Sequence, residues 1–218
     1  MAHTPFESRV AEYDEWFDAH QGAYRAERTA LEHAVPERFD RDRALEIGVG
    51  TGRFGTHLGI ARGLDPARMP LKRARERGID PIRGVAEALP IADDALEVVL
   101  VVTVLEFVDD LEATVAECRR VLDRDGTLVV AVLDRSSPVG QLYQDHKDED
   151  PFYAEAEFVT GEYACEILEE AGLTIERRLQ TIFDAPEDLE NDSMKTTEVR
   201  EGHGEGLFAV IRATPNGR

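Results

Sequence analysis

The sixteen residues 44–59, ALEIGVGTGRFGTHLG, constrain the fold of this chain more than any other stretch. They begin as a short apolar strand that contains Glu46 and continue as a helix, and Gly48, Gly50 and Gly52 alternate in the turn between the two. Glycine adopts positive φ angles and has no side chain, so such a turn lets a ligand approach the backbone closely. The first N–H groups of the following helix point toward the same place. The stretch therefore predicts a binding site for a nucleoside-bearing cofactor.

Strands and helices alternate along the residues that follow. Residues 61–65 are expected to form a strand that ends at Asp65, and the uninterrupted apolar run 97–103, EVVLVVT, is typical of a parallel strand covered on both faces. Residues 127–133 form another apolar segment of strand length. This alternation predicts a doubly wound α/β fold with right-handed crossovers.

The chain of 218 residues is expected to form one domain, because 42% hydrophobic residues suffice for a single core. Within the domain 1–218 we predict an N-terminal helical lid (1–42), a cofactor-binding core (43–135), a substrate-side insertion (136–160) and a C-terminal part with a helix and strands (161–218).

An aromatic stripe runs along residues 6–34, which are expected to be helical, and consists of Tyr13, Trp16, Phe17 and Tyr24. The stripe either packs onto the core, or belongs to a lid whose rings touch cofactor or substrate.

The charge and the cysteine count exclude several classes of function. A formal net charge of −20 argues against nucleic acid as a partner, since phosphate contacts need a basic surface. Two cysteines argue against a disulfide framework, and no segment is apolar enough to span a membrane or to serve as a secretory signal. We therefore expect a cytoplasmic protein, and the histidines and cysteines show no metal-ligand spacing.

The choice of basic residues points to a salt-loaded cytoplasm. Only Lys72, Lys147 and Lys195 are lysines, and the other basic residues are arginines. An acidic, lysine-poor surface resembles that of proteins from salt-loaded cytoplasms, where salt screens the repulsion between the acids. We therefore hypothesise that this is a halophile's protein.

Two registers of the glycine turn compete. Residues 50–55 match the dinucleotide pattern G-x-G-x-x-G, but that pattern expects an acid about 20 residues further on, and Asp65 lies only 10 residues past Gly55. The register that starts at Glu46 and ends with Asp65 on the next strand fits better. In this register the sequence resembles the class I S-adenosylmethionine-dependent methyltransferases.

The resemblance extends beyond the turn, to about residues 10–180. The segments EIGVGTGRF, GLDP, GVAEALP, VTVLEFVDD and CRRVLDRDGTLVV are similar in order and spacing to the methyltransferase type 11 group. The resemblance implies a Rossmann-like sheet of seven strands, mostly parallel with the last strand antiparallel, and S-adenosyl-L-methionine as the cofactor.

It also implies roles for individual residues. Glu46 would lie near the methionine amino group, the three glycines would pass under methionine and ribose, and Asp65 would accept hydrogen bonds from both ribose hydroxyls. The remaining expected contacts are with adenine for Pro66, Ala86 and Glu87, and with the methionine end for Thr103 and Val104. Tyr13 of the aromatic stripe is also expected to contact the cofactor. Two acids have structural alternatives, because Glu46 could cap the nearby helix and Glu87 could be a solvated loop charge.

The catalytic residues are less well specified. Glu106 and Tyr153 are the candidates, with Asp134 and His146 as further bases near the same edge of the sheet. A base is needed only when the nucleophile must lose a proton. The sequence departs from the type 11 pattern at three places, where many relatives have aspartate in place of Val85, Phe-Asp in place of Leu96-Glu97, and a small residue or histidine in place of Glu106.

Three functions remain open from the sequence. The first is methyl transfer to a small-molecule acceptor in a pocket walled by Tyr13, Trp16, Phe152 and Tyr153. The second is a nicotinamide-dependent oxidoreductase, and the third is a non-catalytic protein that binds S-adenosylmethionine.

Overall fold

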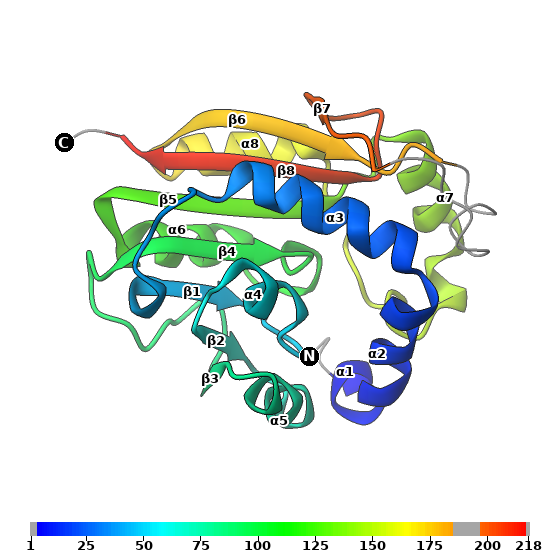
Figure 1. Cartoon of the computed structure of the whole chain (residues 1–218). Helices are drawn as coiled ribbons and strands as arrows, with labels where there is room; N and C mark the ends of the chain where they lie inside the picture. The colour runs from blue at the N-terminus through cyan, green and yellow to red at the C-terminus, as the bar shows by residue number, and fades with distance from the viewer. Residues whose placement is uncertain (1–3, 185–196, 217–218) are drawn as a thin grey trace.

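A sheet of eight strands runs through the described residues, 4–184 and 197–216, of the computed structural model. Its order is β3-β2-β1-β4-β5-β8-β6-β7 (Figure 1). The strands are β1 (Ala44–Ile47), β2 (Arg62–Asp65), β3 (Asp80–Arg83), β4 (Leu96–Val102), β5 (Leu122–Leu133), β6 (Leu173–Thr181), β7 (Arg200–Glu201) and β8 (Phe208–Pro215). From β3 to β5 every neighbouring pair is parallel, whereas β8 is antiparallel to both β5 and β6. The doubly wound fold with an antiparallel last strand is confirmed.

The predicted count of seven strands is wrong for the described residues. The additional strand is β7, whose Arg200 and Glu201 pair with Gln180 and Leu179 of β6. Both residues of β7 are exposed, so they carry no alternation of apolar and polar residues that a sequence pattern could detect.

Helices cover both faces of the sheet. They are α1 (Thr4–Ser8), α2 (Val10–Ala19), α3 (Gln21–Ala34), α4 (Arg53–Leu58), α5 (Arg68–Glu76), α6 (Leu111–Val121), α7 (Pro138–His146) and α8 (Gly161–Glu170), with the short 3₁₀ turns η1 (Arg41–Arg43), η2 (Leu105–Phe107) and η3 (Lys147–Glu149). In Figure 1, α3 crosses one face, whereas α6 and α8 lie on the other.

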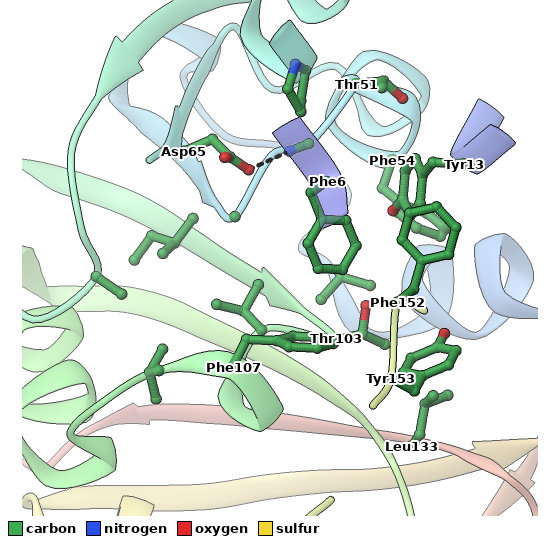
Figure 2. A pocket seen from close by; sticks show the side chains of 18 of the residues that line it. Phe6, Tyr13, Thr51, Phe54, Asp65, Thr103, Phe107, Leu133, Phe152 and Tyr153 are labelled. Atoms are coloured by element: carbon green, nitrogen blue, oxygen red, sulfur yellow. Dashed lines mark hydrogen bonds between the residues drawn. The ribbon is translucent and has the colours of Figure 1, made fainter. Parts of the chain in front are cut away.

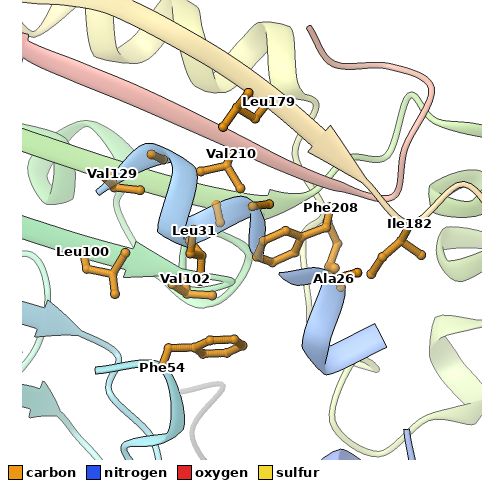
Figure 3. Close-up of a cluster of buried hydrophobic side chains, with 14 of the residues drawn as sticks. Ala26, Leu31, Phe54, Leu100, Val102, Val129, Leu179, Ile182, Phe208 and Val210 are labelled. Carbon is orange, nitrogen blue, oxygen red and sulfur yellow. The ribbon is translucent and has the colours of Figure 1, made fainter. Parts of the chain in front are cut away.

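The central strands alternate between two apolar clusters. Val98, Leu100 and Val102 of β4 belong to the cluster around α3, which Figure 3 shows with Leu31 and Phe208 at its centre. The intervening residues of β4, Val99 and Val101, belong to the cluster around α6 and α8. The run EVVLVVT is therefore apolar because both of its faces are covered.

The N-terminal residues form three helices in place of the single helical segment expected for 6–34. The chain breaks at Arg9 and at His20, which have φ angles of −121° and −112°. At the second break, side chains satisfy the last carbonyl groups of α2, because His20 Nδ1 lies 2.7 Å from the Trp16 oxygen and Gln21 Nε2 donates to the Phe17 oxygen. The breaks separate α3, which packs on the sheet, from α1 and α2, which lie at its carboxyl edge (Figure 1).

No helix of the described residues combines the length and the apolar character that crossing a membrane requires.

Candidate functional site

A cavity of about 370 Å³ lies at the carboxyl edge of the parallel strands. Residues at the ends of four strands line it, namely Ile47 of β1, Asp65 of β2, Thr103 after β4 and Leu133 of β5. The helices α1, α2 and α3 supply the opposite wall. Ligands of open α/β sheets bind at this edge, so the cavity is the candidate site.

Two backbone N–H groups orient the carboxylate of Asp65. Its Oδ2 accepts a hydrogen bond of 2.9 Å from the Gly50 N–H, drawn as a dashed line in Figure 2, and its Oδ1 accepts one of 2.8 Å from Ala67 N–H. The side chain lines the cavity although only 8% of the residue is exposed. The glycine turn therefore fixes the carboxylate at the cavity wall, and a carboxylate there can accept hydrogen bonds from a ligand.

The three glycines of the turn have different structural roles. Gly48 lines the cavity with φ at +67°, and a Cβ there would lie 2.1 Å from Val104 Cγ2. Gly50 also lines the cavity and gives its N–H to Asp65. Gly52 lies outside the lining at the start of α4, where a Cβ would come within 3.1 Å of the Ala74 backbone. Gly48 and Gly50 thus shape the cavity, and Gly52 lets α4 and α5 pack closely.

Glu46 lies outside the cavity lining and is 1% exposed. Its Oε2 accepts a hydrogen bond of 2.8 Å from the Gly55 N–H in the first turn of α4. A Cβ on residue 55 would lie 2.4 Å from that oxygen, so Gly55 makes room for the carboxylate. Burial raises the pKa of Glu46 to about 8. This geometry agrees with the alternative interpretation of Glu46 as a cap of the helix.

A slot next to Asp65 is mostly apolar. Pro66, Val85 and Ala86 line it, and so does Glu87, whose Oε1 accepts a hydrogen bond of 2.9 Å from the Asp109 N–H. The predicted adenine contacts are therefore adjacent in the structure. Glu87 is a partly anchored acid, and the loop 84–90 forms one wall of the slot.

Thr103 follows β4 with φ at +49°, a left-handed conformation that is uncommon for residues other than glycine. Its N–H is held by the Ala131 carbonyl at 2.8 Å, and both Thr103 and Val104 line the cavity. Such conformations concentrate at binding sites, because the surrounding structure must maintain them.

Aromatic rings form the wall that faces the strand ends. Phe6 of α1 contacts Tyr13, Phe107 and Phe152, with ring centroids 5.8, 5.2 and 5.4 Å apart. Tyr153 lies 6.3 Å from Phe107 and 5.5 Å from Phe158. The four residues expected to wall the pocket all line the cavity, namely Tyr13, Trp16, Phe152 and Tyr153. Figure 2 shows Asp65 on one side of this space and Tyr153 with Leu133 on the other.

The structure brings only one of the predicted bases to the cavity. Tyr153 lines it, and burial raises the pKa of its phenol well above the ordinary value. Glu106 is 2% exposed, lies outside the lining, and accepts a hydrogen bond of 2.9 Å from Leu133 N–H through Oε1. Asp134 accepts hydrogen bonds from Ser136 and Gly204, and the exposed His146 contacts the Leu142 carbonyl.

Sequence reasoning missed Glu27, an acid that lines the cavity with 7% of its surface exposed. The spacing of apolar residues in α3 contains a signal that could have identified Glu27. Ala23, Ala30 and Leu31 stand four residues before, three after and four after Glu27, so the acid falls on the apolar face of α3.

Hydrogen bonds of the Asp14 carboxylate link α2 to the glycine turn. Its Oδ1 accepts hydrogen bonds of 2.8 Å from Thr51 Oγ1 and from Arg53 Nε, and its Oδ2 accepts one of 3.0 Å from Arg77 Nη2. Burial alone would raise the pKa of Asp14, but these three hydrogen bonds outweigh it and hold the pKa below its usual value. The helix that carries Tyr13 is thereby held against the turn that orients Asp65.

Comparison with known proteins places this geometry in context. The sequence profile of a methyltransferase domain matches residues 45–130. An uncharacterized protein of Methanocaldococcus jannaschii is 38% identical over 208 residues, which are 95% of this chain and 97% of that protein.

Two solved structures extend the comparison. A protein of Thermotoga maritima, described as an S-adenosylmethionine-dependent methyltransferase and possible histamine N-methyltransferase, is 37% identical, covers 98% of this chain and 100% of its own, and superposes with a TM-score of 0.90. A methyltransferase of Mesorhizobium loti that depends on S-adenosylmethionine shares the fold at a TM-score of 0.64, with 18% identity, 87% of this chain and 97% of its own covered.

Proposed function

The chain belongs to the S-adenosylmethionine-dependent methyltransferases of class I fold, and we propose that it transfers a methyl group to a small-molecule acceptor. The single observation that carries the proposal is the cavity, in which an oriented Asp65 and an aromatic wall face each other across the strand ends. The Thermotoga protein supports the choice of acceptor, because histamine, the acceptor suggested for that protein, is a small molecule.

The residues of the cavity fit the methyl donor. Asp65 would accept hydrogen bonds from the ribose hydroxyls, with both oxygens already oriented by Gly50 and Ala67. The slot of Pro66, Val85 and Ala86 would hold the adenine. Glu87 would accept a hydrogen bond from its amine, which the valine at position 85 cannot do.

The methionine end would lie along Gly48 and Thr103. Gly48 leaves its backbone uncovered on the cavity side, and Tyr13 closes the space from α2. We expect Glu46 and Gly52 to support the site without contacting the cofactor. Glu46 holds the first turn of α4, and Gly52 allows α4 to pack closely against α5.

The chain contributes alignment and exclusion of water. S-adenosylmethionine supplies a methyl group that the positive sulfur already activates. The aromatic wall would hold the acceptor so that its nucleophilic atom faces this methyl group in line with the sulfur, and it would keep water out. Tyr153 would contact the acceptor, since it lies on the side of the cavity away from Asp65 (Figure 2).

The nicotinamide alternative finds no support in the glycine turn. In that pattern the second glycine, Gly52, would approach the pyrophosphate, but Gly52 lies outside the cavity lining and faces Ala74 of α5. The membership in the methyltransferase family points the same way.

Two measurements test the proposal. Calorimetry is expected to show tight binding of S-adenosylhomocysteine and no binding of NADH. Formation of S-adenosylhomocysteine from S-adenosylmethionine, measured with a panel of phenols, amines, thiols and quinone precursors, is expected to exceed the rate without acceptor for at least one class. Binding without transfer to any class would leave a non-catalytic protein.

A further inference from the structure

Glu27 is a buried acid without a partner. Among the described residues nothing donates a hydrogen bond to its carboxylate or forms an ion pair with it, and it lines the cavity with 7% of its surface exposed. Burial raises its pKa to about 8. A buried carboxylate that lacks a partner destabilises a fold, and such groups are typical of functional sites.

Three phenols interact with Glu27. Its charge adds to the burial that raises the phenol pKa values of Tyr13 on α2 and of Tyr153, and it acts on Tyr24 of its own helix as well. Tyr153 also faces Tyr143 of α7 and Asp150.

The cavity favours a cationic ligand. Its described lining contains five acids, Glu27, Asp65, Glu87, Asp109 and Asp150, and neither lysine, arginine nor histidine. No basic group of the described lining could neutralise Glu27.

The helix that carries Glu27 packs on strands that are remote from the strand of Asp65. Glu27 comes from α3, which packs on β5, β6 and β8, whereas Asp65 ends β2. Four inter-strand steps separate β2 from β8 in the sheet, which corresponds to roughly 19 Å at about 4.8 Å per step. We therefore assign Glu27 to the part of the cavity near Tyr13 and Tyr153, on whose phenols it acts, and not to the nucleoside slot.

We propose that the methyl acceptor is an amine and that the Glu27 carboxylate binds its amino group. The proposal rests on the proposed methyl transfer and names its substrate class. The amine enters as an ammonium ion, which the aromatic wall of Tyr13, Trp16 and Phe152 stabilises through cation–π contacts and which Glu27 holds by a charge-assisted hydrogen bond.

The same carboxylate completes the proton balance. The ammonium gives one proton to Glu27 and becomes a neutral amine with a free lone pair. This lone pair forms a bond to the methyl carbon while the bond between carbon and sulfur breaks and leaves its electrons on sulfur. The product is a methylated ammonium ion, and the proton on Glu27 passes to solvent. A carboxylate whose proton affinity burial has raised is suited to this transfer.

Trp16 provides a direct probe of the acceptor half, because it is the only tryptophan of the chain and lines the cavity. The protein saturated with S-adenosylhomocysteine is titrated with 2-phenylethylamine and with 2-phenylethanol, and the Trp16 fluorescence is recorded. We expect the amine to bind at least 10-fold more tightly than the alcohol. In Glu27→Gln this preference is expected to disappear, whereas the affinity for S-adenosylhomocysteine stays within about threefold.

Glu32→Gln is the matched control, because it removes one acid from the exposed side of the same helix. It is expected to retain the preference for the amine. Circular dichroism of Glu27→Gln establishes that the variant is folded.

Several results would overturn the inference. One is equal binding of amine and alcohol to the unchanged protein. Another is a preference that survives in Glu27→Gln. The third is a loss of more than tenfold in affinity for S-adenosylhomocysteine in that variant, which would make Glu27 a ligand of the cofactor's own ammonium group. Methyl transfer to phenols or thiols that Glu27→Gln leaves unchanged would refute the amine and retain the methyltransferase. Absence of transfer to every class would refute the proposed function itself.

Discussion

Backbone N–H groups hold three acids near the carboxyl edge of the sheet, namely Asp65, Glu46 and Glu106. Asp65 is the one that the sequence identifies, because a strand end and a glycine turn leave few other uses for an acid at that position. Glu46 and Glu106 belong to recognisable motifs, yet the side of the backbone to which an acid turns depends on contacts distant in sequence. Glu46 reaches Gly55, and Glu106 reaches Leu133 on the neighbouring strand. Neither contact has a local sequence signal.

Replacing Asp65 by alanine is expected to remove most of the cofactor affinity and to preserve the fold. The carboxylate would no longer meet the ribose hydroxyls, and two charge-assisted hydrogen bonds correspond to a loss of about 100-fold or more. Calorimetry with S-adenosylhomocysteine measures the loss, and circular dichroism monitors the fold. An affinity unchanged in Asp65→Ala would remove this residue from the ribose site.

Glu27 makes stability depend on pH in a direction that follows from its pKa. In the folded protein the pKa is about 8, above the ordinary value of 4.5, so the folded state holds the proton more tightly than the unfolded state. The contribution of Glu27 to the free energy of unfolding is therefore fully present below about pH 4.5 and is lost as the pH rises through about 8.

Glu27→Gln should therefore gain stability relative to the unchanged protein between pH 5 and pH 9, by up to a few kcal/mol. Urea denaturation at the two pH values measures this difference, and Glu32→Gln, which removes only the partly exposed ion pair with His57, is expected to change stability by less than about 1 kcal/mol. The same difference at both pH values would contradict the buried, ionisable state of Glu27.

At the scale of elements, the sheet and its crossovers were predictable from the sequence, and the N-terminal helices were predictable only in part. A continuous helical pattern covers residues 6–34, and neither glycine nor proline stands at Arg9 or His20, where the chain breaks. The breaks depend on tertiary contacts. Glu7 accepts hydrogen bonds of 2.6 and 3.2 Å from Arg68 N–H and Met69 N–H at the start of α5, and Asp14 binds the glycine turn.

These contacts lead us to propose that α1 and α2 act as a lid over the cofactor. Asp14→Asn is expected to weaken binding of S-adenosylhomocysteine about tenfold, because Arg53 and Arg77 lose their shared acid and Tyr13 is held less firmly. Hydrogen exchange of residues 10–19 should become faster.

Asp18→Asn serves as the control for Asp14→Asn, since the carboxylate of Asp18 is exposed and pairs with Arg53. It is expected to change the affinity less than threefold. Equal affinity and equal exchange in Asp14→Asn and the unchanged protein would show that α2 is not a lid.

At the scale of the whole molecule, the surface charge sets the solution behaviour. The net charge is −20, and the cations of the ion pairs between described residues are arginines and histidines. Arg120 illustrates the arginine pattern, since its guanidinium binds Glu117, Asp93 and the carbonyls of Leu89 and Ile91 at once. A lysine ammonium lacks the fork geometry for such a set of partners.

The melting temperature is expected to rise by at least 5 °C between 0.1 M and 2 M KCl. The range of the repulsion between acids falls from about 10 Å at 0.1 M salt to about 3 Å at 1 M. Differential scanning calorimetry measures the shift, and sucrose of equal osmolality shows how much of it is due to factors other than screening. A melting temperature that KCl leaves unchanged would contradict the halophile hypothesis.

A crystal structure with S-adenosylhomocysteine tests the central claim of two cavity halves most directly. We predict that the ribose hydroxyls contact Asp65, that the adenine lies against Pro66 and Ala86, and that the sulfur faces an open space bounded by Tyr153 and Glu27. A methionine end whose ammonium group contacts Glu27, or a nucleoside bound away from Asp65, would contradict this division of the cavity.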